Sequence, residues 1–209
     1  LDWNAERQSD PFHRRSHTIT SARQFTRVVN IMFTFISGII VNKQRLEEIP
    51  HEDPSEFLGT FLIQLSWALP LLRRHRRSLV LWERPVAARQ GNTGGYAIGN
   101  VFGGTLTQVM ARCLPDRPQL AACITNFALR RWFPSILYDL RSSGGKDLQL
   151  DRAHAELKQS YGRNFRYWLF AYPVLTLPLP LARLWFKAGA ILSKLIYMLL
   201  IPTFWRKQI

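Results

Sequence analysis

The feature that most constrains this chain is the separation of its charged and apolar residues into blocks. Long uncharged runs at 28–41 (VVNIMFTFISGIIV) and 57–72 (FLGTFLIQLSWALPLL) lie next to clusters of arginine. Apolar runs with basic flanks are typical of helices that enter or border a membrane. The pattern predicts an all-α membrane protein, with short transmembrane or re-entrant helices and amphipathic interfacial helices.

The first two membrane helices are expected over 25–41 and 57–72. At about 1.5 Å per residue the second would be roughly 24 Å long, which is short for a hydrocarbon core of about 30 Å. Arg27 could extend its side chain to the interface, and local thinning of the bilayer could take up the mismatch. Two buried helices of a soluble bundle are the alternative.

Glycines at intervals of four mark a third expected helix, over 92–111. Gly95, Gly99 and Gly103 would lie on one helix face and let a neighbouring backbone approach closely. A loop is the alternative, because glycine also suits turns. A fourth helix is expected over 119–138.

We expect four regions: a basic N-terminal arm (1–24), a membrane-embedded helical region (25–140), a linker (141–146) and a C-terminal part (147–209). The last contains an amphipathic helix followed by membrane-associated helices. Arg183, Lys187 and Lys194 fall within about 40° of one another on a helix. Such a stripe suits a helix lying in the interface or a spanning helix facing an acidic partner, and the pattern does not decide between them.

The net charge of +14, from 28 basic and 14 acidic residues, predicts a polyanionic partner. Arginines beside apolar runs favour anionic phospholipid, such as cardiolipin, over nucleic acid. The expected lipid-binding residues are Arg73, Arg74, Arg76, Arg77, Arg130, Arg131, Arg183, Lys187 and Lys194.

Few residues in this sequence point to catalysis. Glu47, Glu48, His51, Glu52 and Asp53 could hold a metal or carry protons, but a charged connector between two helices is the favoured interpretation. Cys113 and Cys123 lack the spacing of a zinc site or disulfide framework. We therefore predict no catalytic residues, no metal site and no cofactor other than bound phospholipid.

Together these features predict a non-catalytic accessory subunit of a multi-subunit inner-membrane complex, of the respiratory chain or an ATP synthase. Segment 13–27 has no acidic residue and is rich in Arg, Ser and Thr, like a transit peptide. We thus favour the mitochondrial over the bacterial inner membrane. The alternatives are a translocation or channel-forming component, a membrane-bound lipid-modifying enzyme using Glu47, Glu48, His51 and Asp53, and a nucleic-acid-binding protein.

Overall fold

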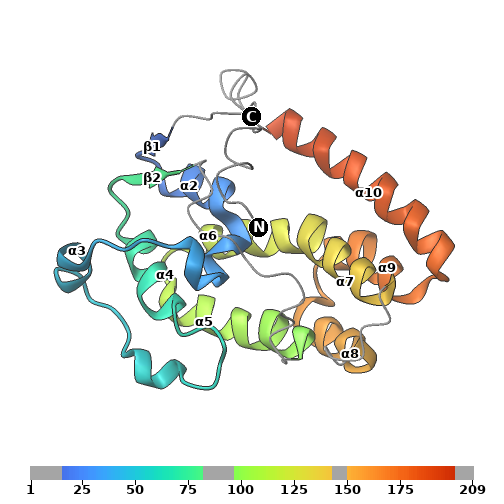
Figure 1. The fold of residues 1–209 in the computed structure, drawn as a ribbon, viewed down its shortest axis with the longest axis horizontal. Coiled ribbons are helices and arrows are strands. Elements are labelled where there is room, and N and C mark those ends of the chain that lie inside the picture. Colours follow the sequence, from blue (N-terminus) through green and yellow to red (C-terminus); the bar gives the residue numbers. More distant parts are fainter. Residues whose placement is uncertain (1–15, 82–96, 143–149, 201–209) are drawn as a thin grey trace, which may run out of the picture.

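The computed structural model describes residues 16–81, 97–142 and 150–200, which are mostly helical (Figure 1). The predicted all-α class is confirmed in this respect. The α-helices are α2 (Ala22–Val29), α3 (Lys43–Glu47), α4 (Leu65–Arg73), α5 (Leu106–Cys113), α6 (Pro118–Phe127), α7 (Phe133–Ser142), α8 (Leu150–Tyr161), α9 (Tyr172–Thr176) and α10 (Leu179–Leu200). Short 3₁₀ turns are η1 (Asn30–Thr34), η2 (Ile36–Gly38) and η3 (Pro54–Phe57), and π-helical turns are η4 (Asn100–Thr105), η5 (Ala128–Trp132) and η7 (Tyr167–Ala171).

A two-stranded antiparallel sheet was not foreseen. Strand β1 (His17–Ile19) pairs with β2 (Ser78–Val80), with Thr18 opposite Leu79. The part of the expected basic arm that the structure describes therefore forms β1, which pairs with β2, and then enters α2. Residues 1–15 of the arm lie outside the described residues. The sheet joins the N-terminal segment to the chain that follows α4.

Neither of the first two expected helices is continuous. The first ends at Val29, because Asn30 adopts a positive φ of 46° and its side-chain oxygen accepts from the Ile31 amide at 2.7 Å. The second is interrupted by positive φ at Gly59 (78°) and Phe61 (60°), so that α4 begins only at Leu65. Local side-chain bonds to the backbone compete with helix formation at such positions. The prediction of helices over 25–41 and 57–72 is wrong.

In the ranges that the structure describes, no helix is both long and apolar enough to cross a bilayer.

The remaining helical predictions are shifted or divided. The third run is helical from residue 98 and continues through η4 into α5, whereas 92–96 lie outside the described residues. The fourth run is α6, η5 and α7 in sequence, and α7 reaches Ser142, inside the expected linker.

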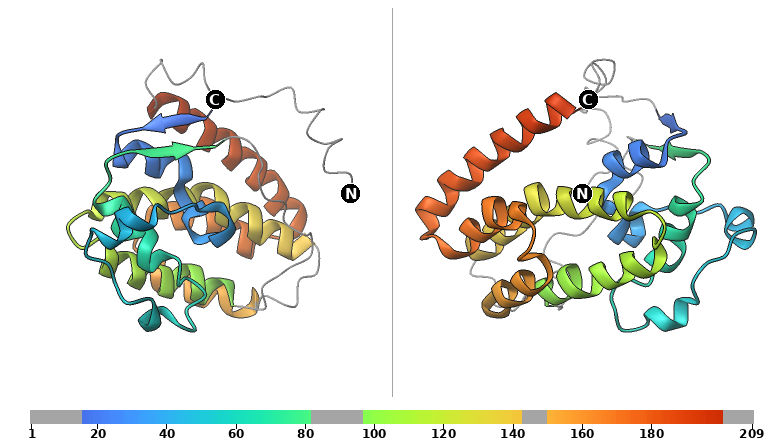
Figure 2. Two further views of the ribbon diagram at one scale, coloured as in Figure 1. Left: turned by 60° about the vertical axis from the view of Figure 1, so that its left-hand side comes forward. Right: turned by 180° about the vertical axis from the view of Figure 1, so that it is seen from behind.

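The core extends from α4 and α5 through α6 and η5 to α7, around fully buried side chains such as Leu69, Leu106, Leu129 and Phe133. Helix α8 packs against η4, and the Tyr161 hydroxyl at its end donates to the Phe102 carbonyl at 2.6 Å. Both figures show α10 along the outer edge of this body, beside α7 and α9 (Figures 1 and 2).

Two glycines allow the contact between η4 and α8. A Cβ added to Gly99 would lie 2.9 Å from the Ala153 Cα, and one added to Gly103 would lie 3.0 Å from the Ser160 Oγ. At Gly99 the Ala153 backbone is too close for a larger side chain, whereas at Gly103 the Ser160 side chain would have to shift. The neighbour of the glycine face is thus a helix of the same chain, and Gly95 lies outside the described residues.

Candidate membrane-surface site

Helix α10 turns its small side chains toward the protein. Over the part of α10 whose side chains are described, up to Leu195, the buried or half-buried positions include Ala182, Gly189 and Ser193, and the large member of this face is Phe186. Phe186 stacks on Tyr138 of α7 with ring centroids 5.4 Å apart. The contact with the body therefore uses little of the apolar surface of α10.

The large apolar residues of α10 point outward instead. Leu184 and Ile191 are each 64% exposed and Leu195 is 53% exposed; Leu181, Trp185 and Leu192 are also exposed. At about 100° per residue these six cover an arc of roughly 120° on the helix. A helix on the surface of a soluble domain normally turns such a face inward, so α10 has the opposite orientation.

The basic stripe of α10 borders this exposed apolar face. Arg183, Lys187 and Lys194 are all exposed, and the same helical geometry places them on an arc of about 40° at one edge of the apolar arc. None of the three forms a salt bridge with a described carboxylate. Their charges are available to an external anion.

A second group of arginines gathers around η5. Burial lowers the pKa of Arg130, and the positive charges of Arg166 and Arg131 lower it further, with Cys123 opposing them. The Arg130 Nε donates to the Asn126 carbonyl at 3.1 Å. Neighbouring like charges repel one another. An anion bound among these arginines would relieve that repulsion.

The arginines at 73–77 lie elsewhere. Arg73 forms an ion pair with Asp116 at 2.5 Å, whereas Arg74, Arg76 and Arg77 are exposed between α4 and β2. In Figure 1 this segment is on the opposite side of the molecule from the Leu179 end of α10. The nine predicted lipid-binding residues therefore do not form one surface. Three are on α10, and Arg130 and Arg131 line a pocket with residues of this helix.

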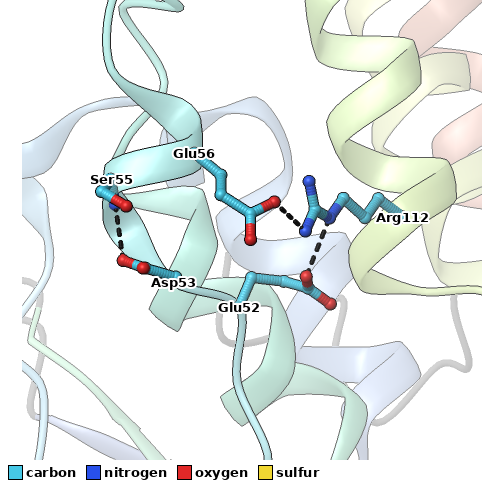
Figure 3. Close-up of polar contacts among 5 residues, drawn as sticks. All are labelled: Glu52, Asp53, Ser55, Glu56 and Arg112. Carbon is cyan, nitrogen blue, oxygen red and sulfur yellow. Dashed lines mark hydrogen bonds and ion pairs between the residues drawn. The ribbon is translucent and has the colours of Figure 1, made fainter.

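The acidic connector is held by partners of its own (Figure 3). Glu52 accepts from the Arg112 Nε at 2.8 Å, and Glu56 pairs with the same guanidinium. Asp53 accepts from the Ser55 amide at 2.8 Å, and this bond lowers the pKa of Asp53. Arg112 thus fastens the connector to α5.

The other carboxylates of the connector are paired locally. Glu47 pairs with Lys43 at 3.6 Å, and Glu48 pairs with Arg45 at 2.7 Å. The His51 ring is 3.1 Å from the Ile49 carbonyl. Over the described residues, no three His, Cys, Asp or Glu side chains are arranged to hold a metal ion.

The two cysteines are free thiols. Burial raises the pKa of Cys113 to about 12. Burial also raises the pKa of Cys123, although the nearby Arg27 and Arg23 oppose the shift. A thiol with a raised pKa is a poor nucleophile at neutral pH, which makes neither cysteine a good catalytic candidate.

Sequence reasoning missed two features of the surface. Arg166 joins Arg130 only through the fold, and no spacing in the sequence relates the two. A further group of exposed apolar side chains lies on segments 32–40 and 58–61: Met32, Phe35, Ile36, Ile40, Leu58 and Phe61. The sequence shows apolar runs in these segments. It does not show which of their residues are exposed, because that depends on the turns that break the helices.

Comparison of the chain with protein-family models, with curated proteins and with solved structures finds no match.

Proposed function

We propose that this chain is a non-catalytic protein that attaches to an anionic membrane surface by laying α10 in the headgroup region. The observation that carries the proposal is the reversed orientation of α10, with small residues inward and leucine, isoleucine and tryptophan outward. An apolar face bordered by lysine and arginine suits a helix lying in the interface. The proposal therefore takes the interfacial alternative for this helix.

Two kinds of interaction would contribute to attachment. Burying a leucine or isoleucine side chain completely is worth about 1.5–3 kcal/mol, and the six outward residues of α10 are about half exposed. Each lysine or arginine near an anionic surface adds about 1 kcal/mol. The apolar contribution is the larger, but the three cations of α10 add enough that loss of either contribution should weaken binding measurably.

The wider role that we propose is that of an accessory subunit in a multi-subunit inner-membrane complex, mitochondrial in preference to bacterial. The exposed apolar group on segments 32–40 and 58–61 supports this part of the proposal. Exposed apolar side chains that lie close together often mark a contact with another protein, and these residues are on different elements from α10.

Vesicle flotation tests the attachment. We expect the protein to float with vesicles that contain an anionic phospholipid and to float much less with purely phosphatidylcholine vesicles. Because salt screens charge, 1 M salt should reduce flotation without abolishing it. The triple variant Leu184→Gln, Ile191→Gln, Leu195→Gln should remain in the soluble fraction.

The matched control replaces exposed leucines outside α10, in the variant Leu79→Gln, Leu81→Gln. It should float like the unmodified protein. Equal flotation of the control and the triple variant would refute a role for the apolar face of α10.

A further inference from the structure

A pocket of about 140 Å³ lies under α10, where this helix crosses η5, the start of α7, and η7. Its lining combines two arginines and a serine with apolar and aromatic residues. The lining residues are Arg130, Arg131, Pro134, Ser135, Phe170, Trp185, Phe186, Gly189 and Ala190.

The polar part of the pocket has no counterion from the described part of the chain. Neither Arg130 nor Arg131 forms a salt bridge there, and Arg166 adds a third positive charge close to Arg130. Among the described residues, the hydrogen bond of this pair of arginines is that of the Arg130 Nε to the Asn126 carbonyl. Guanidinium groups bind phosphate strongly, through charge-assisted and often paired hydrogen bonds.

Trp185 belongs both to the pocket lining and to the exposed apolar face of α10. It is 41% exposed, and its Nε1 donates to the Leu169 carbonyl at 2.8 Å, which fixes the indole ring. Pockets that enclose a whole drug-sized ligand measure about 300–1,000 Å³. This pocket is smaller, so it suits a headgroup and not a complete lipid.

We propose that this pocket binds the phosphate group of a single anionic glycerophospholipid, with Arg130 and Arg131 on the phosphate and the acyl chains leaving past Trp185 along the outer face of α10. The inference deepens the proposed function, on which it rests for the class of ligand. It adds a site that binds one lipid per chain and selects its headgroup. The rest of the surface would attach to the membrane through exposed apolar side chains and positive charge.

Calorimetric titration with soluble short-chain lipid tests the site without a membrane. The full chain is titrated with dihexanoyl phosphatidic acid below its micelle concentration, with dihexanoyl phosphatidylcholine and with inorganic phosphate. We expect one phosphatidic acid per chain, and binding of the other two that is at least about tenfold weaker, because each lacks either the net charge or the apolar part.

The variant Arg130→Gln, Arg131→Gln should weaken phosphatidic acid binding by roughly tenfold or more, since hydrogen bonds to charged groups are the stronger class. Ala190→Phe, which fills the pocket and leaves the charge unchanged, should have a similar effect.

The matched control Arg76→Gln, Arg77→Gln removes two exposed arginines far from the pocket and should bind normally. Circular dichroism checks folding, and Arg130→Lys, Arg131→Lys should show a smaller loss, because lysine keeps the charge but not the paired geometry.

Three results would overturn the proposal: an equal loss in the Arg76, Arg77 control, equal binding of phosphatidylcholine, or inorganic phosphate binding as tightly as phosphatidic acid with no effect of Ala190→Phe. The outcome is separable from that of the proposed function. A protein that floats on anionic vesicles but does not bind the short-chain lipid refutes the pocket alone. A protein that binds the short-chain lipid but does not float refutes surface attachment.

Discussion

Buried polar side chains decide where the helices of the N-terminal half end. Asn30, Thr34 and Gln64 are buried, and the Gln64 amide donates to the Thr34 carbonyl. The Thr34 hydroxyl donates to the Ile31 carbonyl at 2.7 Å. Each of these bonds satisfies a backbone or side-chain group that would be costly to bury alone, so the polar residues stabilise the turns at which the predicted helices break.

His75 is the residue whose titration should affect stability most clearly. It stacks on Phe25 with ring centroids 5.6 Å apart, which joins the end of α4 to α2. Burial lowers the pKa of His75 below its ordinary 6.5, with an opposing contribution from the Thr20 backbone. Below pH 6.5 the unfolded chain therefore binds a proton that the folded protein resists, and stability falls on acidification.

We expect the free energy of unfolding, from urea titrations, to decrease between pH 7.5 and 5.5. In His75→Phe, which can keep the ring contact, this decrease should be smaller. Identical pH dependence in the two proteins would show that other groups cause the acid sensitivity.

At the scale of single elements, the glycines in and just before η4 differ in whether they pack against another helix, and the sequence does not show which ones do. Gly99 and Gly103 face α8 closely, whereas a Cβ on Gly104 would meet nothing within 4 Å. The spacing of four did predict a packing face. It could not show that the partner is α8 of the same chain, because that contact joins residues more than fifty positions apart.

Alanine substitutions at these glycines should have opposite effects. Gly99→Ala should destabilise the protein by about 1–3 kcal/mol, the usual cost of overpacking, because the Ala153 backbone cannot move aside easily. Gly104→Ala should be neutral or stabilising by up to about 1 kcal/mol, since alanine favours the helix over glycine. Chemical denaturation measures both, and equal destabilisation would contradict the described packing of η4 on α8.

The orientation of α10 also depends on contacts with residues far away in the sequence. Its helical character and basic stripe could be predicted from residues 181–201, but its orientation could not. Two small residues and a serine face inward only because Phe186 docks on Tyr138 and Gly189 lies against Phe170, with its added Cβ at 3.4 Å from the Phe170 ring. Those aromatic partners are on α7 and η7, and helical periodicity alone does not locate them.

At the scale of the whole molecule, exposed apolar side chains are concentrated on α10 and on segments 32–40 and 58–61. The blocks in the sequence predicted a helical protein rich in apolar surface. They did not predict which apolar runs would form the core, because α4 and α5 bury theirs while α10 does not. Burial depends on how the runs pack in three dimensions, and the turns at Asn30, Gly59 and Phe61 redirect the chain in a way that periodicity does not predict.

The proposed accessory role makes a prediction at this scale. Native mass spectrometry after extraction from membranes in mild detergent should show the chain with partner subunits and retained phospholipid. Replacing Ile36 and Ile40 by glutamine should release the partners while the lipid remains bound, because these side chains are outside the lipid pocket. A lone chain without partners under these conditions would exclude the accessory role.

The orientation of α10 has a consequence for how substitutions are tolerated along it. In most helices the inward positions resist change and the outward positions accept it. Here the described inward positions, up to Leu195, hold alanine, glycine and serine beside the aromatic ring of Phe186, while the outward leucines would matter for attachment. In a saturation mutagenesis screen scored by cellular function, α10 should therefore show an inverted profile, in which the most accessible positions are the least permissive.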